Sequence, residues 1–269
     1  MRQDIRKRVF EAHKAMSMPP SVEQRLASYP SPPRRKTASR RARGPQGEAL
    51  LDTTVPEAVF RHLSGSLAPF EIVIVPGLDG SGPEHWQSQW QKLFSSYDIA
   101  VSRVRQEIWS KPHYKSWLMT LCAAVTHSKK PVLLVAHSLG CLLVAHAAQQ
   151  GLLPSTVAGA LLVAPADVEN GPSEHLHRVA AFSPIPLSPL PFPALVVGSR
   201  NDPWLGVRRA RTLARHWQAS FVDAGRKGHI GNQCDLGYWI DGLLFLDRLT
   251  QTIVLRNAGQ TRHPKKTLQ

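Results

Sequence analysis

Ser138, Asp202 and His229 are the residues of this sequence whose types and order could support nucleophilic chemistry. Each follows a short apolar run rich in β-branched residues, PVLLVAH, PALVVGS and ASFVDA respectively. A serine hydroxyl becomes a strong nucleophile when a histidine takes its proton and a carboxylate orients that histidine. Taken singly, the three could be a helix N-cap, a turn residue before Pro203 and a loop histidine. Their joint placement after three predicted strands favours catalysis, with His229 as the base and Asp202 as its orienting acid.

The stretch AHSLG (136–140) has the pattern of a nucleophile elbow. A predicted strand ends at His137 and a predicted helix begins directly after Ser138, so the chain must turn sharply there. The small residues Ala136 and Gly140 allow that turn, as in the G-x-S-x-G motif with alanine in the first glycine position. We expect the turn to raise the Ser138 hydroxyl above the sheet edge, at the positive end of the new helix.

Attack on a carbonyl group also needs N–H donors for the oxyanion that forms. One predicted donor is the backbone N–H of Leu139, the residue after the nucleophile. The second is that of Leu78, in the loop VPGLDGSGPEHW, where Gly77 and further glycines permit close approach. A glycine-rich loop could instead bind a phosphate, but this one matches neither GxGxxG nor GxxxxGK[ST]. We therefore predict no cofactor.

The histidines near these motifs need separate interpretation. His85 either forms a wall of the substrate pocket or only bonds a neighbouring loop. His137 and Gly77 are further candidates for the pocket region, although His137 also fits a structural role beside the nucleophile. Trp86 and Trp90 lie four residues apart, which is typical of a packing stripe on a helix. The other histidines have no metal-ligand spacing with cysteines or acids, so we predict no metal site.

The elements that must position these residues alternate along the chain. Six apolar runs separated by helical patterns predict a three-layer α/β fold, with a six-stranded parallel sheet and helices on both faces. The expected strands are 71–75, 99–104, 131–137, 158–164, 193–199 and 219–224, and the expected helices are 84–96, 113–127, 139–150, 204–217 and 232–252. The proline-rich segment 165–192 has room for one short helix but for no large lid domain. An open, shallow pocket suits small esters or amides better than long-chain lipids.

Charge is concentrated at the N-terminus. Residues 1–50 hold 12 Lys and Arg but only 4 Asp and Glu. The difference, 12 minus 4 or +8, is more than half of the net charge of +14 of the whole chain. We expect residues 1–65 to be a disordered basic extension, 66–255 a hydrolase domain and 256–269 a flexible tail. The extension could bind nucleic acid or another anionic partner, act as a targeting segment, be a merely solvated arm or reflect a start assigned too far upstream. Without interleaved aromatic residues, nucleic acid is not the expected partner.

Composition bounds the remaining properties. The sequence lacks the roughly 18 to 20 continuous apolar residues that a membrane-spanning helix needs, and its N-terminus lacks the apolar centre of a secretory signal. Three widely spaced cysteines suit reduced thiols better than a disulfide framework. We expect a cytoplasmic monomer whose partner is a small ester or amide substrate, with no membrane association.

With these motifs assembled, residues 71 to about 250 resemble the small α/β-hydrolases of the YdeN and retinoblastoma-binding-protein-nine type. The stretches that carry the resemblance are VPGLDGSGPEHWQSQW (75–90), AHSLG (136–140), PLPFPALVVGSRNDPW (189–204), GHIGN (228–232) and YWIDG (238–242). The resemblance implies a reduced sheet and assigns Ser138, Asp202 and His229 as the catalytic triad. The expected activity is that of a carboxylesterase-like serine hydrolase. The alternative is a weakly catalytic or non-catalytic module of the same fold that binds a protein, while the basic extension binds anionic partners.

Overall fold

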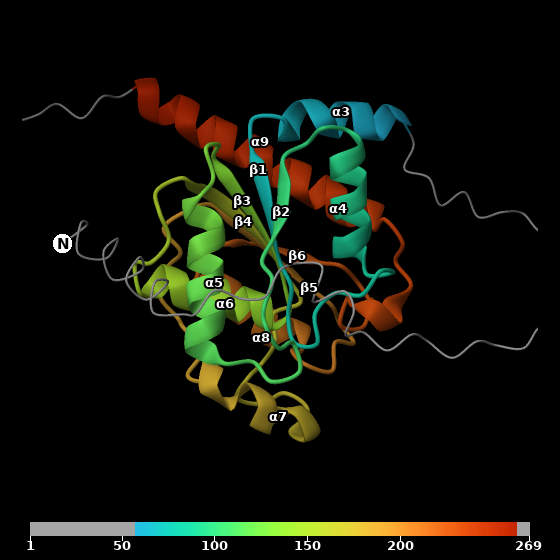
Figure 1. Cartoon of the computed structure of the whole chain (residues 1–269), viewed down its shortest axis with the longest axis vertical. Helices are drawn as coiled ribbons and strands as arrows, with labels where there is room; N and C mark the ends of the chain where they lie inside the picture. The colour runs from blue at the N-terminus through green and yellow to red at the C-terminus, as the bar shows by residue number, and fades with distance from the viewer. Residues whose placement is uncertain (1–56, 263–269) are drawn as a thin grey trace, which may run out of the picture. The chain divides into compact units, whose positions relative to one another are not determined.

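A six-stranded parallel sheet forms the centre of the structure, which is a computed structural model that describes residues 57–262 (Figure 1). The strands lie in the order β2-β1-β3-β4-β5-β6. Their bounds are β1 (Glu71–Val75), β2 (Val101–Arg103), β3 (Val132–His137), β4 (Val157–Val163), β5 (Ala194–Gly198) and β6 (Ser220–Asp223). The predicted α/β-hydrolase fold class and all six predicted strands are confirmed, with ends that differ by one or two residues.

Helices cover both faces of this sheet. They are α3 (Glu57–Leu67), α4 (Trp86–Ser96), α5 (Tyr114–Thr126), α6 (Leu139–Gln149), α7 (Ser173–Val179), α8 (Val207–His216) and α9 (Ile240–Arg262), with short 3-10 turns η1 (Ala180–Phe182) and η2 (Asn232–Cys234). Alternation along the strands divides the core: Ile72 and Ile74 pack with α3, α4 and α9, whereas Val73 and Val75 pack with α5, α6 and α8. Because β1 is apolar on both faces, it can be buried between the two helical layers.

The expected boundary of the folded domain at residue 66 is wrong. Helix α3 begins at Glu57 and buries Phe60, Leu63 and Leu67 in the core shared with α4 and α9. These side chains recur at three- and four-residue spacing, so they form one apolar stripe. Burial of this stripe offsets the conformational entropy that is lost when the helix forms. The rest of the predicted basic extension, residues 1–56, lies outside the described residues.

The C-terminal helix also differs from its predicted bounds. Its expected start near residue 232 is wrong because Asp235, Gly237 and Trp239 have φ angles of 42°, 51° and 40°, which interrupt a right-handed helix. Helix α9 then continues to Arg262. The prediction of a flexible tail from residue 256 is therefore wrong for residues 256–262. Residues 263–269 lie outside the described residues.

The strand order places a topological switch between β1 and β3. Both strands are parallel neighbours, but the chain leaves β1 towards β2 on one side and continues from β3 towards β4 on the other. Open α/β sheets bind ligands in the crevice at the carboxyl ends of the strands at such a point. The loops that contain Leu78 and Ser138 follow β1 and β3, so both emerge at the switch.

The connection between β4 and β5 contains only the short helix α7 and the turn η1, as expected from its length. Within this connection there is no large lid domain. Figure 1 shows α7 beyond the carboxyl ends of the strands. None of the helices in residues 57–262 is long and apolar enough to cross a membrane.

Candidate active site

Ser138 lies at a strained turn between β3 and α6. Its φ and ψ angles are 54° and −123°, a backbone conformation that non-glycine residues rarely adopt. Its N–H donates to Val163 O of the neighbouring strand over 3.0 Å, which fixes the turn. A Cβ atom at Gly140 would lie 2.4 Å from Val75 O, and one at Gly77 would lie 2.8 Å from the Cβ of Ser138. The elbow therefore requires glycine at both positions.

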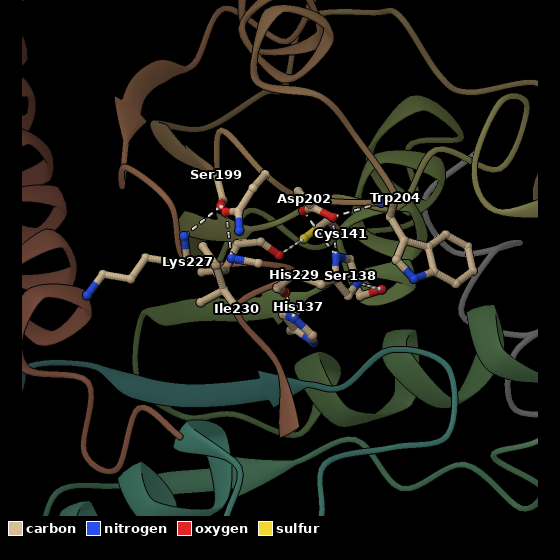
Figure 2. A network of polar contacts seen from close by, with 12 residues as sticks. His137, Ser138, Cys141, Ser199, Asp202, Trp204, Lys227, His229 and Ile230 are labelled. Carbon is tan, nitrogen blue, oxygen red and sulfur yellow. Dashed lines mark hydrogen bonds and ion pairs between the residues drawn. The ribbon is translucent and has the colours of Figure 1, made fainter. Parts of the chain in front are cut away.

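A continuous hydrogen-bond chain joins the three residues on which the sequence prediction centres (Figure 2). The Ser138 hydroxyl lies 2.7 Å from His229 Nε2, and His229 Nδ1 lies 2.9 Å from Asp202 Oδ1 and 3.0 Å from Oδ2. Since a carboxylate only accepts, Nδ1 carries the imidazole proton and Nε2 is free to accept the proton of the serine. The Asp202 side chain is 1% exposed, and the Trp204 N–H also donates to its Oδ1 over 2.8 Å.

Two buried side chains hold the loop that presents His229. His137 Nε2 donates to the backbone carbonyl of His229 over 2.9 Å, and Trp86 Nε1 donates to that of Ile230 over 2.8 Å. Ile230 has a φ of 50°, so the loop needs such anchors to keep its shape. The predicted packing role of Trp86 agrees with its 1% exposure, and the hydrogen bond adds an anchoring role that the sequence did not reveal.

The loop after β5 braces the other side of the His229 loop. Ser199 Oγ accepts from the N–H of Lys227 over 3.0 Å, and Asn201 Oδ1 accepts from the N–H of Gly228 over 2.9 Å. Ser199 and Asn201 lie three residues and one residue before Asp202, so the segment that supplies the carboxylate also fixes the backbone beside His229. The two loops form one hydrogen-bonded unit.

The N–H groups of Leu139 and Leu78 are the candidate oxyanion donors. Leu139 is the first residue of α6, so its N–H has no acceptor within the helix. Within residues 57–262, neither N–H donates to another protein group. Gly77 lets the two segments approach closely, since a Cβ atom at this position would lie only 3.0 Å from Leu139 N and 2.8 Å from Ser138 Cβ. The two N–H groups without a protein acceptor thus belong to segments that approach each other at Gly77.

Comparisons with known proteins agree with this arrangement. The family model of the serine hydrolases matches residues 72–248. The chain belongs to the serine hydrolase family. No curated protein matches the sequence. Among solved structures, a YdeN-like hydrolase from Pectobacterium atrosepticum is 31% identical, with a TM-score of 0.61 over 73% of this chain and 97% of that chain. The resemblance to YdeN-type hydrolases inferred from the motifs is confirmed.

More distant structures share the fold of this serine hydrolase. The YdeN protein of B. subtilis is 17% identical, with a TM-score of 0.57 over 67% of this chain and 98% of that chain. Mouse alpha/beta hydrolase domain-containing protein 10 is 15% identical, with a TM-score of 0.50 over 70% of this chain and 90% of that chain. The hydrolase therefore shares its architecture with bacterial and mammalian proteins of low sequence identity.

His85 of the hydrolase caps α4 and is only 2% exposed. Its Nδ1 accepts the N–H of Gln87 over 3.1 Å. Burial, with smaller contributions from Arg103 and His229, lowers the pKa of His85 to about 3, so the ring is neutral. His137 lies next to it at a ring-centroid distance of 4.9 Å and is 6% exposed. The structure therefore gives both histidines supporting positions, and their burial leaves little surface for the substrate contact that the sequence suggested.

Gln87 is a supporting residue that sequence reasoning missed. It is fully buried on α4, where its Nε2 donates to Val135 O over 3.0 Å and its Oε1 accepts from Ser81 Oγ over 2.5 Å. Gln87 thereby ties the loop that contains Leu78 to β3, the strand that leads into Ser138. The only signal in the sequence is a polar residue next to the apolar stripe of Trp86 and Trp90, which does not predict these partners.

The described part of the hydrolase has no cluster of three or more His, Cys, Asp or Glu residues that could hold a metal. Cys122, Cys141 and Cys234 are free thiols. Burial raises the pKa of Cys122 to about 11 and that of Cys141 well above its usual range, so both are un-ionised at neutral pH. The groups whose geometry supports chemistry are the serine with its histidine and carboxylate, joined by hydrogen bonds.

Proposed function

We propose that this hydrolase cleaves small carboxylic esters through an acyl-enzyme intermediate on Ser138. As Oγ bonds to the carbonyl carbon, the hydroxyl proton passes to His229 Nε2 and the carbonyl electrons move onto the oxygen. The resulting oxyanion accepts from the N–H groups of Leu78 and Leu139. Asp202 keeps the imidazole in its reactive orientation and stabilises the imidazolium.

In the following steps His229 acts first as an acid towards the leaving group and then again as a base towards water. The tetrahedral intermediate collapses, the bond to the leaving alkoxide breaks, and His229 Nε2 returns its proton to form the alcohol. A water molecule then gives a proton to His229 and attacks the acyl carbon, and collapse releases the acid and restores the Ser138 hydroxyl. All protons are accounted for by His229 and water.

The observation that carries this proposal is the hydrogen-bond chain from Ser138 through His229 to Asp202. Its distances of 2.7 Å and 2.9 Å lie within the reach that proton transfer requires. The strained turn at Ser138 supports the same conclusion, because residues held in such conformations concentrate at functional sites. Membership of the serine hydrolase family supports the class of reaction.

The preference for small substrates rests on the short connection between β4 and β5. It contributes one seven-residue helix to the region above the site, which provides little enclosed apolar surface for a long acyl chain. Amides are a harder second substrate class, because an amine anion is a much poorer leaving group than an alkoxide and the bond breaks only as His229 protonates it. We therefore place esters first.

The experiment is a series of p-nitrophenyl esters with acyl chains from two to sixteen carbons. We expect kcat/KM to be greatest for short chains and to fall for chains beyond about ten carbons. Ser138→Ala should abolish turnover, while Ser128→Ala, which alters a half-buried serine outside the site that bonds only to Lys130, should leave it unchanged. A maximum at long acyl chains would contradict the small-substrate proposal, and equal turnover by wild type and Ser138→Ala would contradict the role of Ser138.

A further inference from the structure

Helix α7 contacts both sides of the candidate site through two residues on one helical face. His175 and Arg178 are three positions apart, so their side chains emerge on the same side of the helix. The ring of His175 stacks on Trp204 with a centroid distance of 5.5 Å and an interplanar angle of 7°. Trp204 in turn stacks on His229 at 5.7 Å and 28°. Figure 2 shows the Trp204 indole beside His229 and Ser138.

Arg178 makes the contact on the opposite side. Its guanidinium donates to Asp79 Oδ1 over 2.5 Å, and donates twice to the backbone carbonyl of Ser110, over 3.2 Å from Nε and 3.0 Å from the terminal nitrogen. Asp79 directly follows Leu78, has a φ of 61°, and donates its N–H to Trp109 O over 3.1 Å. Arg178 therefore contacts the side chain of the residue next to the candidate oxyanion donor.

The chain just before α7 is itself fixed to the domain. Asp167 is 2% exposed; its Oδ1 accepts from the N–H groups of Glu169 and Asn170 and its carboxylate pairs with Arg209 of α8. Glu169 adds a second ion pair to Arg209 at 2.7 Å. Since this segment is anchored to α8, α7 can act as a fixed point for the two loops that it contacts.

The ion pair between Arg178 and Asp79 is poorly placed to stabilise the fold. Asp79 is 55% exposed, and exposed ion pairs contribute little to the free energy of unfolding. The pair nevertheless restrains the loop whose Leu78 N–H must point at the oxyanion. Loss of the ion pair should therefore lower kcat and increase the mobility of the loop more than it lowers the free energy of unfolding.

We infer that α7 is a positioning bridge across the active site: Arg178 orients the Leu78 N–H through Asp79, and His175 orients His229 through Trp204. Arg178 and His175 are positioning residues, because each acts on the reacting groups through another side chain. The inference rests on the proposed function, since it takes Leu78 as an oxyanion donor. Oxyanion contacts strengthen as the tetrahedral intermediate forms, so misplacement lowers kcat more than it raises KM.

The test compares Arg178→Gln, Asp79→Asn and their double variant with Arg208→Gln. Asn is close in shape to Asp and tolerates positive φ, and Arg208 is an exposed arginine of α8 outside the site. For a short p-nitrophenyl ester we expect each single variant to lose about tenfold in kcat with KM within about twofold. The double variant should lose no more than Arg178→Gln, because the contact that Asp79→Asn weakens is already absent without Arg178. Arg178→Lys should recover part of the loss, and Arg208→Gln should match wild type.

Two further measurements separate this inference from a purely structural role and from the proposed function. The affinity for a short alkyl boronic acid, which forms a tetrahedral adduct with the serine, should fall in parallel with kcat. Amide hydrogen exchange in the peptide that spans 77–82 should become at least about fivefold faster in Arg178→Gln and unchanged in Arg208→Gln. If kcat, boronate affinity and exchange in both single variants stay within twofold of Arg208→Gln, the bridge is overturned. If wild type is inactive, the proposed function fails, and the exchange measurement still decides the bridge.

Discussion

The Nε2 N–H of His137 donates a hydrogen bond to the backbone carbonyl oxygen of His229 over 2.9 Å. The residue before the nucleophile thus holds the loop that carries the general base. His137 ends β3, so a fully buried inner strand of the sheet fixes both partners of the proton transfer. This contact explains how a loop histidine can keep a 2.7 Å distance to the Ser138 hydroxyl.

Replacing His137 should therefore damage activity and stability together. His137→Phe keeps a ring but leaves the His229 carbonyl unpaired, which should cost about 1–3 kcal/mol of unfolding free energy. We expect kcat/KM for a short ester to fall at least about tenfold. His137→Gln, whose amide nitrogen can replace Nε2, is the matched control and should retain most of both properties. Equal losses in the two variants, measured by ester hydrolysis and urea unfolding, would show that the hydrogen bond is not the cause.

Gly140→Ala should prevent the elbow from forming. The added Cβ would meet Val75 O at 2.4 Å and Pro76 O at 2.8 Å, and both obstacles are backbone atoms that cannot move away cheaply. We expect loss of activity and destabilisation by at least about 2 kcal/mol, measured by thermal unfolding. Gly65→Ala in α3 is the control: its Cβ meets no atom within 4 Å, so it should stabilise the helix by about 0.5–1 kcal/mol. A stable, active Gly140→Ala protein would contradict the observed turn.

Buried neutral histidines should make stability depend on pH. Burial lowers the pKa of His85 to about 3 and that of His137 well below its usual range, whereas an unfolded histidine has a pKa of about 6.5. Below pH 6.5 the unfolded state binds protons that the folded state does not. The free energy of unfolding should therefore fall as pH decreases from 6.5 towards 3, by up to about 1.4 kcal/mol per pH unit for each histidine.

Urea unfolding between pH 7 and pH 4 checks this dependence. His85→Asn should flatten the slope, because Asn can still cap α4 but does not titrate. His113 is an exposed histidine that caps α5 in the same way, so His113→Asn is a matched control that should leave the slope unchanged. A wild-type slope of zero over this range, or the same slope in His85→Asn and wild type, would rule out the proposed origin.

The position of α3 in the core predicts that its apolar stripe contributes to folding. Leu63 is fully buried, so Leu63→Ala should lower the free energy of unfolding by about 2–5 kcal/mol. Ser64→Ala alters the neighbouring position, whose hydroxyl bonds only to the carbonyl of Arg61 in the same helix, and should change stability by less than about 0.5 kcal/mol. Calorimetric unfolding of the two variants measures this difference. Equal stability would mean that the domain begins after α3.

The features that the sequence predicted correctly are those encoded by local patterns. Continuous apolar runs marked the inner strands β1, β3, β4 and β5 because each is covered on both faces, whereas the edge strands β2 and β6 are only partly buried. The small residues around Ser138 marked the sharp turn. Helix α3 was missed because its stripe, Phe60 with Leu63 and Leu67, is short and follows a long basic segment. The bridge from His175 and Arg178 and the contacts of Gln87 join residues far apart in the chain, and no local pattern encodes such partners.

The central claim is that Ser138 is a nucleophile activated by His229, and labelling by a fluorophosphonate tests it most directly. The probe reacts with an activated serine, and mass spectrometry of the digested protein identifies the modified residue. We predict a single adduct on Ser138 in wild type, no adduct in Ser138→Ala, and labelling at least about a hundredfold slower in His229→Ala. A folded wild-type protein that resists the probe, or that is labelled equally fast without His229, would contradict the account.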